Sequence, residues 1–284
     1  MSALRQRVID VMTLEGLSPL TQKAYLYQMT EVSRYFNQSP DCIRRSDIQG
    51  YLLYLIRERC WSWSSCRQSI HALNFLFQKV LGRSRLRITL PHPHKQQRIP
   101  DLLYPEEVLR MIDACERGKA KAAMMLAYAT GMRVGEVARL KVIDLDGNNS
   151  SIKVREGKGC RDRYVLFPES LKVQLREYWK EYRPSDFVIY GLDKDRAIHA
   201  STLRRGMKLA AQQAGINKTV RFHSLRHAFA CHQLLAGMPL PRLQVLLGHQ
   251  TIQTTFRYLQ WVAMMDLKTQ SSEDLLREFG KGDE

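Results

Sequence analysis

The sequence lacks any hydrophobic run long enough to cross a membrane, and it shows no secretory signal. Its longest apolar-rich run free of charged residues and histidine covers residues 122–132, whereas a spanning helix needs roughly 20 residues. Internal repeats and low-complexity tracts are also missing. We therefore expect a soluble protein that acts in the cytoplasm.

Cysteines are too scattered to form a disulfide framework. The six cysteines form no C-x-x-C pair, and they lie at positions 42, 60, 66, 115, 160 and 231. In a chain of this length, that distribution indicates reduced intracellular thiols.

A zinc site is one alternative, because His223, His227 and Cys231 recur every four residues and would share a helix face. Arg226 lies between the two histidines, and no H-E-x-x-H carboxylate is available as a base. We therefore expect neither a metal nor any other cofactor.

Acidic residues are absent between Glu58 and Asp101, and the whole chain carries 44 Lys and Arg against 28 Asp and Glu, a net charge of +16. Such an excess favours a polyanionic partner, although a basic run can also be a solvated face.

Residues 266–284 hold six acids against three bases, so this tail should lie on protein. The predicted DNA contacts in the acid-free stretch are Arg67, Lys79, Arg83, Arg85, Arg87, Lys95 and Arg98.

The length of 284 residues exceeds the usual size of one domain, so two domains are expected. Residues 1–86 predict a small helical domain of three amphipathic helices, the first opening at Ser18 and Pro19. Its expected buried stripe comprises Leu20, Ala24, Tyr27, Val32 and Tyr35.

Residues 87–102 are basic and proline-punctuated, which is typical of a linker. A cationic linker could follow a phosphate backbone while joining two domains across a duplex, so we expect a C-shaped clamp on DNA.

Residues 103–284 predict a second, mixed α/β domain. Helices are expected at about 105–116, 119–129, 133–140, 168–182, 201–214, 224–236, 241–247 and 251–257. The strand-like segments "SIKVR" and "RYVLF" flank "EGKGC", which predicts a hairpin with Lys158 at its tip. The fold class is therefore mainly α, with a small antiparallel sheet in the second domain. Further DNA contacts are expected from Arg204, Arg205 and Lys208 on one helix face.

The densest reactive segment is "FHSLRHAFACHQLL". His223 and Arg226 would be neighbours at a helix start, where backbone N–H groups favour an anion. Arg133 starts another helix and offers a second phosphate grip, with an ordinary surface salt bridge to Glu136 or Asp144 as the alternative. Together with Lys158, His249 and Tyr258, these residues suit phosphoryl transfer without a metal.

In that chemistry, a phenolate attack builds negative charge on two non-bridging oxygens and on the departing sugar oxygen, and cations must meet all three. Arg133 and Arg226 would hold the non-bridging oxygens, and His249 would donate a further hydrogen bond. Lys158 would protonate the leaving 5′ oxygen, and His223 would help to deprotonate Tyr258, whose pKa starts near 10.

"ATGMRVGEV", "REGKGCRDR", "HSLRH" and "LGHQTIQTTFRY" occur in the order of the tyrosine recombinase family, and residues 103–261 resemble it. The helical amino-terminal part resembles the family's core-binding domain. The resemblance places the family's six catalytic residues on Arg133, Lys158, His223, Arg226, His249 and Tyr258.

The resemblance implies a site-specific recombinase of a mobile element, which exchanges strands between paired sites through a 3′-phosphotyrosyl intermediate without ATP or metal. It also implies a homotetramer on two DNA duplexes, in which a C-terminal helix of residues 261–279 docks on its own chain or on a neighbour. A type IB topoisomerase and a non-catalytic DNA-binding accessory protein stay open as alternatives. On DNA, the protein would be nucleoid-associated.

Overall fold

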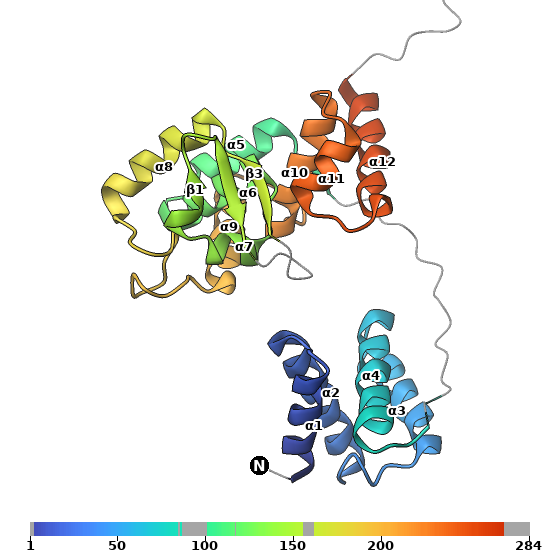
Figure 1. Ribbon diagram of the computed structural model, residues 1–284. Coiled ribbons are helices and arrows are strands. Elements are labelled where there is room, and N and C mark those ends of the chain that lie inside the picture. The colour runs from blue at the N-terminus through green and yellow to red at the C-terminus, as the bar shows by residue number, and fades with distance from the viewer. Residues whose placement is uncertain (1–2, 85, 87–100, 117, 156–161, 270–284) are drawn as a thin grey trace, which may run out of the picture. The chain divides into compact units, whose positions relative to one another are not determined.

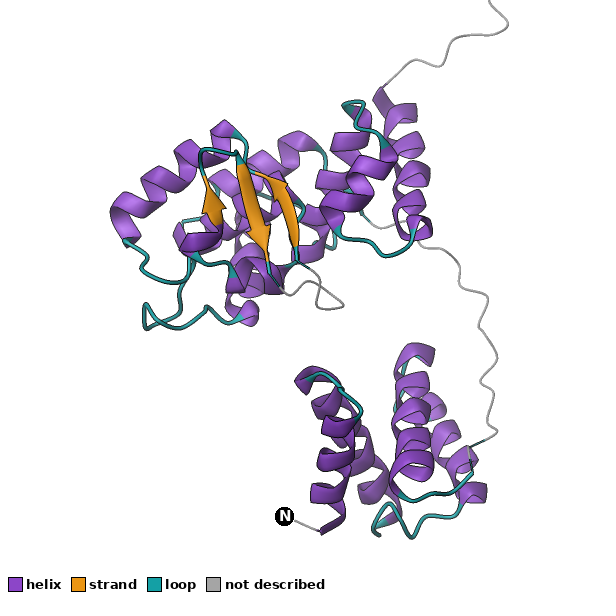
Figure 2. Cartoon of the chain, viewed as in Figure 1, coloured by secondary structure: helices purple, strands orange, loops and turns teal. Residues whose placement is uncertain are grey.

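The computed structural model describes residues 3–84, 86, 101–116, 118–155 and 162–269. The chain divides into two compact units, Met1–Arg98 and Ile99–Glu284, and each is described by itself (Figure 1). The fold class predicted from the sequence, mainly helical with a small antiparallel sheet, is confirmed (Figure 2).

The first unit is helical, and its helices begin where the sequence supplies caps. Ser18 accepts a hydrogen bond from the Thr21 amide, and Ser62 does the same for Ser65. Its described elements are α1 (Ala3–Leu14), α2 (Pro19–Phe36), α3 (Arg45–Arg57) and α4 (Trp63–Phe75), with α4 continuing as a π-helical segment, η1 (Leu76–Val80).

Two expectations for this unit were wrong. Helix α1 was not predicted, and it packs Val8 and Met12 against Met29 of α2 and against η1. As a result α2 buries Gln28, Met29 and Val32, whereas Leu20, Tyr27 and Tyr35 are 79%, 50% and 42% exposed. The helix has apolar side chains on two faces, and periodicity alone cannot choose between them when a packing partner has been missed.

The second unit is built around helix α6 (Gly118–Thr130), whose small side chains let neighbouring helices approach closely. Ala120, Ala122, Ala123 and Ala127 are all buried, and α6 packs against α7, α8, α9 and α10. The surrounding helices are α5 (Pro105–Asp113), α7 (Val134–Arg139), α8 (Glu169–Tyr182), α9 (Ala200–Gln213), α10 (Phe222–Leu235), α11 (Leu240–Leu247) and α12 (Ile252–Thr269).

The sheet lies on one side of this unit (Figure 2). Its antiparallel order is β1 (Leu145–Asp146), β2 (Ser151–Val154) and β3 (Arg163–Leu166), preceded by a 3-10 turn, η2 (Val142–Asp144). Val154 pairs with Arg163, so β2 and β3 form the predicted hairpin. Strand β1 was not predicted.

Among the described residues, no helix is both long and apolar enough to cross a membrane.

Candidate active site

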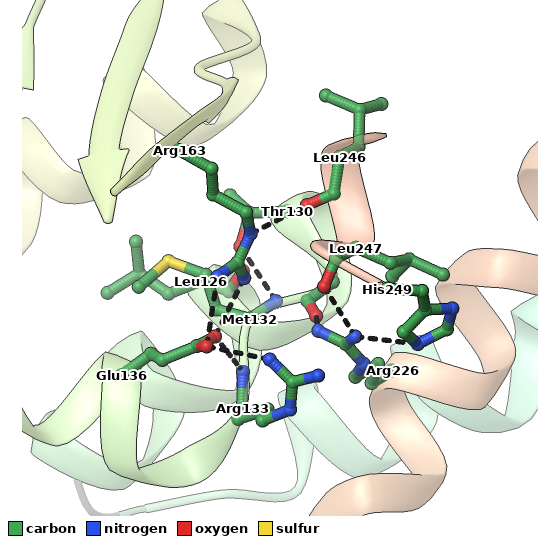
Figure 3. Close-up of polar contacts among 11 residues, drawn as sticks. Leu126, Thr130, Met132, Arg133, Glu136, Arg163, Arg226, Leu246, Leu247 and His249 are labelled. Atoms are coloured by element: carbon green, nitrogen blue, oxygen red, sulfur yellow. Dashed lines mark hydrogen bonds and ion pairs between the residues drawn. The ribbon is translucent and has the colours of Figure 1, made fainter. Parts of the chain in front are cut away.

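Arg226, on α10, is buried in the second unit and only 1% exposed. Its guanidinium donates hydrogen bonds to the carbonyl oxygens of Gly131 at 2.7 Å and Leu247 at 2.6 Å (Figure 3). Burial lowers the pKa of Arg226 to about 10, so the group still carries its charge at neutral pH. Its Nε is buried without a hydrogen-bond partner among the described residues. The carbonyls therefore fix a charged group that retains a free donor.

Glycine is required at one of these carbonyls. Gly131 follows α6 with a φ of +68°, and an added Cβ would approach the Phe229 ring within 2.5 Å and Leu247 within 2.9 Å. The left-handed turn aims the Gly131 carbonyl at Arg226.

His249 is the third partner of Arg226. Its Nε2 lies 3.0 Å from the Arg226 guanidinium, and its Nδ1 lies 2.9 Å from the Thr255 hydroxyl. An arginine can only donate, so Nε2 accepts and the ring proton sits on Nδ1. Burial and the charge of Arg226 lower the pKa of His249 to about 4, which keeps this ring neutral.

Arg133 is held by a buried carboxylate. Glu136 accepts hydrogen bonds from the Arg133 amide at 2.8 Å and from its guanidinium at 2.9 Å. Arg163 of β3 donates two bonds to the same carboxylate, at 2.9 and 2.8 Å, and a third to the Leu246 carbonyl at 2.9 Å (Figure 3). Burial alone would raise the pKa of Glu136, but Arg163 and Arg133 together lower it to about 2.

Tyr258, on α12, lies beside this cluster and is 3% exposed. Its ring is parallel to that of His249, with centroids 6.2 Å apart, and its hydroxyl is 3.2 Å from His227 Nδ1. Burial raises the pKa of Tyr258, while the charge of Arg226 opposes the shift.

The histidine at the tyrosine hydroxyl differs from the expected one. The prediction assigned His223 to this place, yet His227 is within hydrogen-bond distance. The two rings meet edge to face with centroids 4.4 Å apart. His223 is instead exposed at the surface, where partial desolvation and then the charges of Arg226 and Arg133 lower its pKa.

The structure thus brings together Arg133, His223, Arg226, His249 and Tyr258. The predicted sixth residue, Lys158, lies outside the described residues. Glu136, Arg163, Thr255 and His227 complete the cluster and were not predicted to serve it. His227 was visible in the sequence as the last residue of "HSLRH", one helical turn after His223.

A basic groove of about 690 Å³ opens beside the cluster. It is lined by Arg133 and His223, and by Arg204, Lys208, Lys218 and Arg221. Arg204 and Lys208 are exposed, as is Arg205 on the same helix, α9. Lys218 is paired with Glu107 at 2.6 Å. The groove offers a cationic approach to Arg133 and His223.

Two of the DNA-contacting residues predicted in the first unit have partners within that unit. Lys79 is paired with Glu15 at 2.8 Å, and Arg83 donates to the Asp41 carbonyl at 2.8 Å. Arg67 lies on α4. Arg85, Arg87, Lys95 and Arg98 lie outside the described residues, as does most of the expected linker.

No group of three or more His, Cys, Asp or Glu side chains within the described ranges is arranged to hold a metal ion.

Comparison with known proteins gives consistent matches along the chain. Residues 101–263 match the phage integrase family, and residues 4–85 match the phage integrase N-terminal SAM-like domain. A putative integrase/recombinase of Sinorhizobium fredii is 36% identical over 280 residues, covering 97% of this chain and 90% of the relative. A tyrosine recombinase XerC of Lactobacillus delbrueckii subsp. bulgaricus is 30% identical, covering 92% and 94%.

Among solved structures, the XerH site-specific recombinase bound to its difH substrate before cleavage superposes with a TM-score of 0.71. The alignment covers 94% of this chain and 85% of that protein, at 19% identity. At this identity the match shows a common fold.

Proposed function

The chain belongs to the phage integrase family, the tyrosine recombinases, and from that premise we propose which of its residues perform site-specific DNA strand exchange. Recombination of this type cuts and rejoins strands through a 3′-phosphotyrosyl intermediate. The matches do not favour the topoisomerase and accessory-protein alternatives.

Tyr258 is the proposed nucleophile, since its hydroxyl lies against the arginine and histidine cluster of its own unit. Its attack forms the bond between Oη and phosphorus and breaks the bond to the 5′ oxygen. A 5′ hydroxyl from a partner strand then reverses the step. The energy of the broken bond stays in the phosphotyrosine, so the reaction we propose needs neither ATP nor a metal ion.

Arg133 and Arg226 are the proposed clamps for the two non-bridging oxygens, because paired arginines can match the charge that develops there. Glu136 and the two carbonyls fix their directions before DNA arrives. His223 lines the groove with Arg133 and would contact the same phosphate. Lys158 is the proposed donor to the leaving 5′ oxygen.

His249 must gain a proton before it can assist phosphate binding. Its Nε2 accepts a hydrogen bond from Arg226 in the free protein, so it can donate to a phosphate oxygen only after gaining a proton. A bound phosphate raises the pKa of a neighbouring histidine, and this favours that proton.

The observation that carries the proposal is the contact of the Tyr258 hydroxyl with the cluster, and the covalent adduct tests it. On a nicked suicide duplex, the wild-type protein should accumulate a protein–DNA adduct, and the Tyr258→Phe variant should form none. Tyr128→Phe is the matched control, because Tyr128 also bonds a histidine of α10, His232, through its hydroxyl. An adduct formed by the Tyr258→Phe protein would refute the nucleophile.

Adduct formation in the presence of EDTA and without nucleotide tests the proposed independence from metal and ATP. An adduct that forms only after a divalent ion is restored would contradict it.

The two units receive separate roles in this proposal. In it, residues 1–86 are the core-binding domain, 87–102 the linker and 103–284 the catalytic domain. Because its substrate is DNA, the cytoplasm, at the nucleoid, is the proposed place of action.

A homotetramer on two duplexes is the proposed active assembly, with residues after α12 docking on a neighbouring subunit. Trp261, Val262 and Met265 of α12 itself pack on their own chain, beside Phe229 and Leu247. The segment offered to a neighbour therefore starts beyond Thr269. A chain truncated after Thr269 should bind one site but lose assembly of paired sites in analytical ultracentrifugation.

A further inference from the structure

The hydroxyl of Tyr258 has a hydrogen-bond partner with no part in the chemistry outlined above. His227 lies on α10, one residue after Arg226, and its Nδ1 is 3.2 Å from Tyr258 Oη. Trp261 meets the rings of both residues edge to face, with centroids 4.9 Å from His227 and 5.2 Å from Tyr258. Trp261 therefore packs against both partners of this contact.

The direction of this hydrogen bond follows from the surroundings. Arg226, the charged neighbour of Tyr258, can only donate, so it cannot accept the proton of the hydroxyl. The one proton of the hydroxyl is then free to point at His227. Burial, with His223, Arg226 and His249 as further causes, lowers the pKa of His227 to about 3, so the ring is neutral and Nδ1 can accept.

The groups that face His227 come from three parts of the unit. His223 and Arg226 belong to its own helix, His249 to the segment after α11 and Tyr258 to α12. Within the described part of the chain, no carboxylate is among the groups that shift the pKa of His227.

We propose that His227 is the base that takes the phenol proton when Tyr258 attacks DNA, an inference that rests on Tyr258 being the nucleophile. The proton moves from Tyr258 Oη to His227 Nδ1 as the bond between Oη and phosphorus forms. The bond between phosphorus and the 5′ oxygen breaks, and a separate donor, proposed above as Lys158, protonates that oxygen.

A neutral, buried imidazole is adequate for this step because the acidity of the phenol changes during the reaction. Once Oη is bonded to phosphorus it becomes an ester oxygen and can no longer retain a proton, so even a weak base receives it. The entering phosphate also offsets the charge of Arg226, which had lowered the basicity of His227. In the reverse step His227 returns the proton to the departing tyrosine.

The test is the rate of adduct formation by His227→Asn under single turnover, as a function of pH. Asparagine can place an amide oxygen near the position of Nδ1, so it keeps an acceptor for the hydroxyl but takes no proton. We expect a rate about 100-fold below wild type at pH 7. The rate should climb about tenfold per pH unit above that, because hydroxide then supplies the deprotonation.

A more acidic nucleophile should rescue the variant. Replacing Tyr258 by a fluorinated tyrosine should raise the rate of His227→Asn much more than that of the wild type. A merely structural role for His227 would lower the rate equally at every pH and would leave no such rescue.

His232→Asn is the matched control, since His232 lies on the same helix and its Nδ1 accepts from Tyr128 at 2.9 Å, while its Nε2 donates to the Leu103 carbonyl. It should keep the wild-type pH profile. Wild-type rates for His227→Asn, or a loss independent of pH, would overturn the inference. An adduct formed by Tyr258→Phe would instead overturn the proposed function, so the two failures are distinct.

Discussion

At the scale of single residues, Glu136 connects the sheet to Arg133, one of the two proposed phosphate clamps. It is the one carboxylate that bonds both Arg133 and Arg163 within the described residues, and Arg163 continues to the carbonyl of Leu246. The next carbonyl, that of Leu247, holds Arg226. Arg133 and Arg226, the proposed clamps, are therefore linked through these hydrogen bonds and the backbone from Leu246 to Leu247, and a substitution at Glu136 would interrupt the link.

Glu136→Gln should destabilise the protein and slow catalysis together. Losing one partner of a buried ion pair costs about 3 kcal/mol, because Arg163 stays buried without its counter-charge. The displaced Arg133 should slow adduct formation about 100-fold. Chemical denaturation and the single-turnover assay measure the two effects.

Lys172→Met is the control for Glu136→Gln. Lys172 is a buried cation of the same unit, bonded to the Gly147 carbonyl and Ser150, and the active-site contacts do not include it. It should lower stability without changing the rate of adduct formation by the remaining folded protein. If Glu136→Gln forms adduct at the normal rate, the positioning role is wrong.

At the scale of elements, the site depends on where helices end. The turn after α6 and the left-handed Gly248 after α11 place the carbonyls and His249 around Arg226. Thr130 stabilises the first of these turns, since its hydroxyl donates to the Leu126 carbonyl at 2.6 Å and accepts from the Met132 amide at 3.3 Å. Helix ends therefore supply the backbone acceptors that a buried arginine needs.

Gly131→Ala should be more damaging than a left-handed glycine elsewhere. Both Gly131 and Gly215 have positive φ, and an alanine in that conformation costs about 1–2 kcal/mol. Only at Gly131 would the methyl group also meet Phe229 and Leu247, whereas Gly215 has open space around it. Gly131→Ala should therefore lose more stability and most of its adduct formation, and Gly215→Ala should lose only stability. Equal effects of the two substitutions would contradict the packing argument.

The elements of the second unit could largely be predicted from the sequence, because its helices carry clear apolar stripes and are bounded by Pro, Gly and Ser. Helix α12 continues to Thr269, well beyond the predicted end at 257, since Trp261, Val262 and Met265 pack on the same chain. Strand β1 has two residues and no alternation to detect. Helix α1 lies before the first clear cap, at Ser18. Its apolar residues are buried only because α2 and η1 pack against them, and the sequence alone does not show that contact.

The arrangement of the site was less predictable than its members. Ordered motifs pointed to five residues that the fold brings together, but spacing cannot say which of two histidines one turn apart faces the tyrosine. That depends on how α12 crosses α10. The pairing of Glu136 with Arg163 likewise depends on β3 lying beside α7, a contact between segments far apart in the sequence.

At the scale of the whole molecule, the net charge of +16 should make DNA binding strongly dependent on salt. Each phosphate contact releases counterions, so the logarithm of affinity falls linearly with the logarithm of salt concentration. Arg204→Gln and Lys208→Gln, in the groove beside the site, should each reduce that slope by about 1. Arg176→Gln is the control, because Arg176 is exposed on α8 and paired with Glu169. Salt-insensitive binding, or equal slopes for all three variants, would contradict the groove as a DNA surface.

Stability should also depend on pH, through the neutral histidines of the second unit. The folded-state pKa is about 3 for His227 and about 4 for His249, whereas an unfolded histidine titrates near 6.5. Between those values the unfolded chain binds more protons than the folded one, so the free energy of unfolding falls as the pH is lowered below about 6.5. Glu136, with a pKa of about 2, adds a further loss below about pH 4.5.

Between pH 7 and pH 5, each of these two histidines should cost about 1–2 kcal/mol of unfolding free energy, allowing for their partial exposure to solvent. Denaturant unfolding at the two pH values measures the sum. His227→Phe cannot gain a proton, so it should be less stable than wild type at pH 7 but should lose about 1–2 kcal/mol less on acidification. A variant whose acid sensitivity equals that of the wild type would show that His227 is already protonated in the folded protein at pH 5. A protonated ring cannot accept the hydrogen bond of Tyr258 at Nδ1, so the same measurement bears on the proton transfer proposed for catalysis.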